Sequence, residues 1–357
     1  MDREPEPTAN PETGASTETT GARDGSSPAS APPAGNQARA STAPTSTPSP
    51  APTSGEPTTT DLAPAEVQER CIASPCEPSI LPEQPDLPFL EDMGDGWVRL
   101  MEVEWHVGAG AEGYRCRTFT VPEDIHVTAF FPQVPLGTHH LGFDVSAVPT
   151  RPDGLYACGV STVGERKLQG AGIGSEPTEL PDGVAMPLLK GQQLFLNLHL
   201  FNASTEALRG RSGMWVRTVP AEEVVHRAEV ILAGPLNLQV PPGRSTQSGH
   251  CTLRADATLY GIAPHMHQTG VHTRATLVST SGEQTVLFDG PHDFEHQLWY
   301  TVEERQLHAG DRVDIECTYE NDTSRTIPWG DSALDEMCFV NLSVYPAIGY
   351  GAGVCED

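Results

Sequence analysis

The sequence has no apolar run near the roughly 20 residues that a membrane-spanning helix requires. It is also poor in basic side chains: 21 Lys and Arg stand against 48 Asp and Glu, for a formal net charge of −27. A surface this acidic repels phosphate backbones, which argues against nucleic acid as a partner. We therefore expect no transmembrane segment and no nucleic-acid binding.

The N-terminus, which begins Met1-Asp-Arg-Glu-Pro-Glu-Pro, lacks the apolar segment of a signal peptide. No repeated Cys-x-x-Cys is present, so a structural zinc module is not indicated. The eight cysteines lie between Cys71 and Cys355, and their even number favours disulfides and an oxidising, extracytoplasmic compartment. Spacing alone pairs only Cys71 with Cys76. We therefore expect a mature or trimmed chain, with room for a lipid or surface anchor ahead of Met1.

Residues 1–85 are dominated by Pro, Thr, Ser, Ala and Gly. Such a segment has too little apolar surface to offset the entropy lost on ordering, so we predict a disordered linker. A Pro-rich linker is extended and suits a stalk between an anchor and a domain. A plain disordered extension without an anchor is the alternative.

Short alternating apolar and polar runs follow, separated by clusters of Gly, Pro and Asp, and no segment keeps a 3.6-residue apolar period over three turns. This pattern is typical of all-β proteins built from sandwiches. We place a boundary near Glu222. The prediction is two antiparallel, jelly-roll-like β-sandwich domains, residues 95–222 and residues 223–357.

Histidines carry the chemistry that the sequence offers, because neither a G-x-S-x-G elbow nor paired catalytic carboxylates are indicated. His265 and His267 are two residues apart in a run that reads as a strand, so both imidazoles share one face. Such a pair can hold a metal ion with two neutral nitrogens. By the same parity Met266, between them, points to the other face and into the core.

His139 and His140 are adjacent, and neighbours in an ideal strand point to opposite faces. Both reach one ion only if the backbone bends there, which Pro135 and Gly137 permit. Alone, the pair also fits two unrelated histidines. His199 lies in a strand whose other face carries four leucines, so it is either a ligand or a histidine at a domain interface.

Met337 enters the last long strand beside Cys338, and a disulfide at Cys338 would fix its backbone. Methionine there is normally core, but a thioether is a soft ligand that favours Cu(I). His265, His267 and Met337 together would form a copper site. His139, His140 and His199 would form a second one.

In this combination the chain resembles the copper type II, ascorbate-dependent monooxygenases, the family of peptidylglycine α-hydroxylating monooxygenase and dopamine β-monooxygenase. The resemblance runs from about Gly96 to Cys355, and its elements appear in the family order. They are Tyr114-Arg-Cys116, His139-His140, Leu198-His199, Pro241-Pro-Gly243, Cys251, His265-Met-His267-Gln-Thr-Gly270, Cys317-Thr-Tyr319, Gly330 and Asp335-Glu-Met-Cys338.

The resemblance implies two sandwiches facing each other across a solvent-filled cleft. It implies an electron-transfer copper on His139, His140 and His199, and a catalytic copper on His265, His267 and Met337 that binds dioxygen and substrate. Ascorbate would reduce both copper ions, and an activated C–H bond of a small organic substrate would be hydroxylated. It also implies three disulfides, which are Cys116–Cys158, Cys251–Cys355 and Cys317–Cys338.

Two departures from the family concern the substrate. The peptide-amidating members carry an arginine and a tyrosine that bind the peptide's terminal carboxylate, and here these positions hold Ala263 and Asn341. We therefore predict that the chain is not a peptide amidator. A secreted copper-binding protein without oxygenase activity is the alternative function, and a two-sandwich adhesion module is a third. The sequence leaves the oligomeric state open.

Overall fold

The computed structural model describes residues 69–159, 165–294, 296–330, 334–351 and 353–356. These residues form strands and short loops, with one 3-10 turn, η1 (Ala221–Glu223), and no α-helix among them. No described helix is long and apolar enough to cross a membrane. Most of the predicted linker lies outside the described residues. The all-β fold predicted from the sequence is confirmed in the part of the chain that is described.

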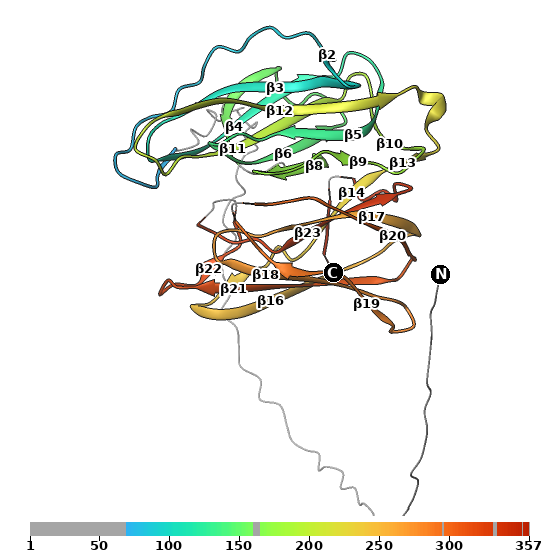
Figure 1. Ribbon diagram of the computed structural model, residues 1–357. Coiled ribbons are helices and arrows are strands. Elements are labelled where there is room, and N and C mark those ends of the chain that lie inside the picture. Colours follow the sequence, from blue (N-terminus) through green and yellow to red (C-terminus); the bar gives the residue numbers. More distant parts are fainter. Residues whose placement is uncertain (1–68, 160–164, 295, 331–333, 352, 357) are drawn as a thin grey trace, which may run out of the picture. The chain divides into compact units, whose positions relative to one another are not determined.

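Two sheets make the first sandwich (Figure 1). One sheet has the order β1-β4-β11-β6-β8, with β7 beside β4, and contains β1 (Arg70–Cys71), β4 (Ala111–Thr120), β6 (Thr138–Ser146), β7 (Gly154–Cys158), β8 (Arg166–Gly172) and β11 (Gln193–Phe201). The other has the order β13-β10-β5-β12-β3-β2, with β9 beside β5, and contains β2 (Glu91–Gly94), β3 (Trp97–Val107), β5 (Ile125–Gln133), β9 (Thr178–Glu179), β10 (Val184–Leu188), β12 (Leu208–Val219) and β13 (His226–Arg227).

The second sandwich follows, coloured from yellow to red in Figure 1. Its first sheet has the order β20-β17-β23-β14-β24 and contains β14 (Glu229–Ala233), β17 (Ala257–His265), β20 (Tyr300–Leu307), β23 (Phe339–Tyr345) and β24 (Val354–Cys355). Its second sheet has the order β16-β21-β18-β19 and contains β16 (Gly243–Thr252), β18 (Gly270–Val278), β19 (Gln284–Pro291) and β21 (Arg312–Asn321). A small ladder joins β15 (Gln239–Val240) to β22 (Ile327–Pro328).

Nearly all strand pairings are antiparallel; β13 and β24, of two residues each, pair in parallel with β10 and β14. Two apolar cores are present: one fills the second sandwich, and the other fills the first and extends to Val230 and Tyr260 of the second. In β11 the four leucines at 194, 196, 198 and 200 are at most 1% exposed and belong to the first core. Each contributes about 1.5–3 kcal/mol by leaving water. The predicted division of this strand into a leucine face and a histidine face is therefore confirmed.

Four disulfides are present, and they are the four predicted pairs: Cys71–Cys76, Cys116–Cys158, Cys251–Cys355 and Cys317–Cys338. No cysteine is free in the described structure. The second and fourth pairs lie close to the histidine strands, because Cys116 faces Asn197 across β4 and β11, and Cys338 follows Met337.

Residues 69–85 make more contacts than a disordered linker would. The backbone N–H of Ile80 donates to the Nδ1 atom of His106 at 3.0 Å, and the Gln84 amide bonds the backbone of Glu104 from both ends. The Cys71–Cys76 disulfide and the pairing of β1 with β4 fix the start of this stretch. The ordered part of the chain therefore begins well before residue 85.

Candidate metal centre

The first histidine group lies where β6 and β11 run side by side. His199 pairs with His140, and the next pair joins Leu200 to Thr138, so His139 is an extra residue in a β-bulge. A bulge locally breaks the alternation of side chains, so adjacent residues can turn toward the same side. The bend predicted at this point is present.

One nitrogen each from His139, His140 and His199 lies within 4.8 Å of the others. The Nδ1 atoms of His139 and His140 are 2.9 Å apart. Two imidazole nitrogens at that distance must share a proton or a cation between them, because neither can accept without a donor. The three imidazoles are close enough together to hold one metal ion between them.

The imidazole of His199 is oriented by a hydrogen bond to Glu112 of β4. Its Nε2 atom lies 2.7 Å from the Glu112 Oε1 atom, and both side chains are almost fully buried. A carboxylate only accepts, so Nε2 carries the hydrogen and Nδ1 keeps its lone pair. That Nδ1 atom is buried and has no hydrogen-bond partner among the described residues. The Tyr114 ring stacks on the imidazole with centroids 4.4 Å apart.

The second group lies at the end of β17. Antiparallel pairing sets His265 opposite Phe339 of β23, which follows Met337 by two residues. Glu336, the residue before Met337, ties this segment to the histidines: its buried carboxylate accepts from the backbone N–H groups of His267 and Thr269 at 3.0 and 2.7 Å. Met266 is fully buried in the second core, as the strand parity predicts.

In both imidazoles of the second group the Nδ1 atom is hydrogen-bonded and the Nε2 atom is left to bind a metal ion. The Nδ1 atom of His265 lies 2.5 Å from the amide oxygen of Gln297, and that of His267 lies 3.1 Å from the backbone oxygen of Asp335. Since both partners can only accept, each Nδ1 carries the hydrogen and each Nε2 keeps a lone pair. Carbonyl partners of this kind commonly orient metal-binding histidines.

Burial keeps four of the imidazoles, those of His139, His140, His265 and His267, neutral. Loss of water around the cation, reinforced by neighbouring imidazoles, lowers the pKa of His139 and of His265 to about 3, and burial lowers that of His267 to about 4. The same causes lower the pKa of His140 well below its ordinary value. Neutral imidazole is the form that binds metal ions.

The two groups lie in contact. The rings of His140 and His265 have centroids 5.9 Å apart, and Phe294 of the second sandwich packs on His139 at 4.0 Å. The expected solvent-filled cleft is therefore not present at the histidines. The absence of a side chain at Gly172 of β8 lets the second sandwich approach this closely, because a Cβ atom there would come 2.7 Å from the Gln297 backbone nitrogen.

The sequence did not reveal Glu112, Gln297 or the Asp335 carbonyl as partners of these histidines. A buried acid at the start of a strand was the available signal for Glu112. No local pattern marks Gln297.

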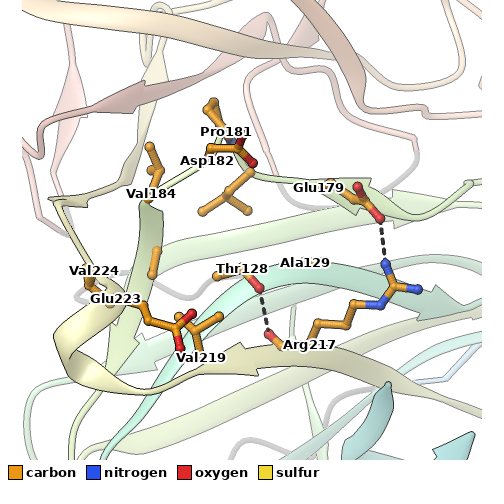
Figure 2. Close-up of a pocket in the computed structure, with 13 residues that line it drawn as sticks. Thr128, Ala129, Glu179, Pro181, Asp182, Val184, Arg217, Val219, Glu223 and Val224 are labelled. Carbon is orange, nitrogen blue, oxygen red and sulfur yellow. Dashed lines mark hydrogen bonds and ion pairs between the residues drawn. The ribbon is translucent and has the colours of Figure 1, made fainter. Parts of the chain in front are cut away.

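A cavity of about 290 Å³ lies elsewhere on the first sandwich, between β5, β10, β12 and η1 (Figure 2). Its charged lining consists of Glu179, Asp182, Glu223 and Arg217, and Arg217 pairs with Glu179 at 2.7 Å. None of the six proposed metal ligands lines it. The histidine groups, not this cavity, are the candidate centre.

Comparison with known proteins agrees with the motifs. Residues 226–356 match the profile described as copper type II ascorbate-dependent monooxygenase, C-terminal domain. DBH-like monooxygenase protein 1 of Gallus gallus is 28% identical over 223 residues, which cover 56% of this chain and 35% of that protein. The chain thus spans about a third of that relative. These matches confirm the resemblance found in the sequence.

Among solved structures, dimeric latent PorU from Porphyromonas gingivalis overlays on 66% of this chain and 24% of that chain, with 8% identity and a TM-score of 0.18.

Proposed function

We propose that this chain, a relative of the copper type II ascorbate-dependent monooxygenases with that family's C-terminal domain in residues 226–356, is a dicopper monooxygenase. It would hydroxylate a C–H bond of a small organic substrate with dioxygen, and ascorbate would be the reductant. The four disulfides favour work outside the cytoplasm.

One observation carries the proposal. The buried Nδ1 atom of His199 has no described hydrogen-bond partner, although burying such an atom costs about 1–3 kcal/mol. One ring nitrogen from each of His139, His140 and His199 lies within 4.8 Å of the others. A metal ion at this point would satisfy all three nitrogens, so the residues fit copper.

The second ion would be held by the Nε2 atoms of His265 and His267 and the thioether of Met337. Imidazole suits both Cu(I) and Cu(II), while the thioether favours Cu(I). Bound copper would supply one-electron redox chemistry and the activation of dioxygen. The protein's own part is to keep the imidazoles neutral, to fix which nitrogen faces the ion, and to hold the two groups in contact.

The overall reaction balances with ascorbate alone as the electron source. One oxygen atom enters the substrate C–H bond to give C–OH, and the other leaves as water. That product pair needs two electrons and two protons, which two one-electron oxidations of ascorbate supply. No side chain has to act as a nucleophile.

Asn341 supports the exclusion of peptide amidation. It lies opposite Ala263 in the β17–β23 ladder, and its amide nitrogen donates to the Ala263 carbonyl at 3.1 Å. The amide oxygen is therefore the free end, and it has no hydrogen-bond partner among the described residues. Neither Asn341 nor Ala263 therefore supplies the charged donor that a buried carboxylate needs.

A copper-binding protein without oxygenase activity is the second candidate. The contact between His140 and His265 and the burial of His139, His199 and His267 favour it, because they leave a substrate little access in this state. Both candidates predict copper uptake, so only turnover separates them.

The test is a copper titration followed by an oxygen-uptake assay. Apoprotein should bind about two equivalents of Cu(I) under anaerobic conditions, His199→Ala should remove one, and Met337→Ala should weaken the other. Ascorbate-dependent oxygen uptake is then measured with a panel of small amines and phenols. Uptake coupled to a hydroxylated product establishes the oxygenase. Saturation at one equivalent with Met337→Ala silent would refute the dicopper site.

A further inference from the structure

The loop between β19 and β20 carries side chains from the second sandwich onto both histidine groups. Phe294 packs its ring on His139 of the first group. Three residues later, Gln297 reaches His265 of the second group. Trp299 donates from its indole nitrogen to Ser343 of β23 at 3.1 Å, which fixes the end of the loop to its own sheet.

The orientation of the Gln297 side-chain amide, nitrogen against oxygen, is fixed by its neighbours. Its nitrogen lies 3.4 Å from the backbone oxygen of Phe294, which can accept but not donate. The amide oxygen is therefore the atom that lies 2.5 Å from the Nδ1 atom of His265. This contact selects the tautomer of His265 whose Nε2 atom is free for a metal ion, and it also fixes the plane of the ring.

The backbone of Gln297 is held by the other sandwich. The N–H of Gly172 in β8 donates to the Gln297 carbonyl oxygen at 2.9 Å. Gly172 lies opposite His140 in the β6–β8 ladder. A Cβ atom at Gly172 would come 2.7 Å from the Gln297 nitrogen, so this approach requires glycine for its lack of a side chain. Gln297 thus contacts His265 of the second group through its side chain, and through its backbone it contacts β8, the strand that pairs with His140 of the first group.

We propose that Gln297 is a positioning residue for the second metal ion, and that the first sandwich holds it in place through Gly172. This inference rests on the proposed function, because it assumes that His265 binds the ion. Gln297 acts through His265: it sets the free nitrogen and raises the basicity of the ring by accepting its hydrogen. Loss of such a partner commonly weakens metal binding about 10–100-fold.

Three variants test the side chain. Gln297→Leu removes the acceptor at similar size, Gln297→Glu keeps an acceptor and strengthens it, and Gln306→Leu is the matched control. Gln306 is an exposed glutamine of β20 that bonds Thr258, with no contact to a histidine. Copper affinity is measured by competition with a chelator, and the Cu(II) EPR spectrum is recorded in a His199→Ala background that isolates the second site.

Gln297→Leu should weaken the second copper about 10–100-fold and alter its EPR spectrum, with the affinity of the first copper unchanged. Gln297→Glu should restore affinity and lower the reduction potential of the second copper, since a carboxylate makes the ligand more basic. Gln306→Leu should match wild type. Circular dichroism and thermal unfolding of each apoprotein establish that the variants fold. If Gln297→Leu does not fold, the affinity and reduction potential of Gln297→Glu still test the role of the side chain.

Gly172→Ala tests the hold from the first sandwich without touching a ligand. Its methyl group must displace the Gln297 backbone, so it should reproduce the weakened second site and altered EPR spectrum of Gln297→Leu. Gly159→Ala is the control, because a Cβ atom there has nothing within 4 Å.

If wild type binds two coppers and both Gln297 variants keep its affinity, spectrum and potential, this inference is wrong and the proposed function stands. A Gly172→Ala protein with an unchanged second site would refute the hold from the first sandwich. If wild type binds only one copper, the proposed function fails first, and this inference with it.

Discussion

The buried carboxylate of Glu336 accepts a hydrogen bond from the backbone N–H of His267 at 3.0 Å, and so ties one proposed ligand to the residue before another, Met337. Glu336 has no exposed surface, and burial raises its pKa. Four donor groups point at its two oxygens, from His267, from the backbone and hydroxyl of Thr269, and from Met337.

Replacing Glu336 by alanine should therefore destabilise the apoprotein and abolish the second copper site. The loss leaves buried donors unpaired, so we expect a cost of at least about 3 kcal/mol in the free energy of unfolding. Urea unfolding measures it. Glu316→Ala, on the exposed face of β21, is the control and should cost less than about 0.5 kcal/mol. Equal costs would show that Glu336 does not hold the ligand segment.

Glu112→Gln should weaken the first copper and spare the second. The neutral amide accepts a weaker hydrogen bond from the Nε2 atom of His199 than the carboxylate does. We expect about 10–100-fold lower affinity at the first site, measured by the same competition titration. Glu179→Gln, which changes an exposed acid paired with Arg217, should leave both affinities at wild type. If both glutamine variants behave alike, Glu112 is not an orienting group for His199.

The apoprotein should lose stability as the pH falls from 7 to 5. The pKa values of His139 and His267 are about 3 and about 4 in the folded protein, against about 6.5 when unfolded. Between these values the unfolded chain binds protons that the folded chain does not, so acidification favours unfolding. The expected loss at pH 5 is on the order of 2 kcal/mol per histidine, read from urea midpoints.

His308 provides the control for this pH effect, because its side chain is 65% exposed. His308→Ala should keep the wild-type difference between the two pH values, whereas His139→Ala should reduce it. A wild-type apoprotein with the same midpoint at pH 5 and pH 7 would contradict the burial argument.

A glycine-extended peptide should not be hydroxylated, because Ala263 and Asn341 supply no charged donor for its carboxylate, and the Asn341 amide N–H is already bonded to the Ala263 carbonyl. Product analysis by mass spectrometry after incubation with copper, ascorbate and oxygen checks this. A small amine from the same panel serves as the comparison substrate. Turnover of the peptide at a rate similar to that of the best amine would show that carboxylate binding does not depend on these two positions.

Much of the site was predictable because it depends on local chemistry. Histidine and methionine at fixed spacings indicate copper, the parity of β11 separates the leucine core from His199, and glycine and proline ahead of His139 permit the bulge. The position of Met266 in the core follows from parity in the same way.

The rest depends on contacts that no local pattern encodes. Glu112 lies 87 residues from His199 and reaches it through the pairing of β4 with β11, and Gln297 lies 32 residues from His265 and reaches it from a loop, so neither contact can be read from nearby residues. The contact between the two histidine groups has the same origin. It depends on the absence of a side chain at Gly172, which leaves room for the Gln297 backbone. Neither residue belongs to a sequence motif for a metal ligand.

The bulge at His139 makes the length of this strand as important as its composition. If one residue were deleted between Gly137 and Leu141, regular pairing could be restored, but one of the two imidazoles would then turn into the leucine layer. If one were inserted, the ladder that aligns His140 with His199 would shift by a residue. A substitution near the centre changes one side chain and keeps this alignment, whereas a single insertion or deletion in β6 displaces a proposed ligand at once.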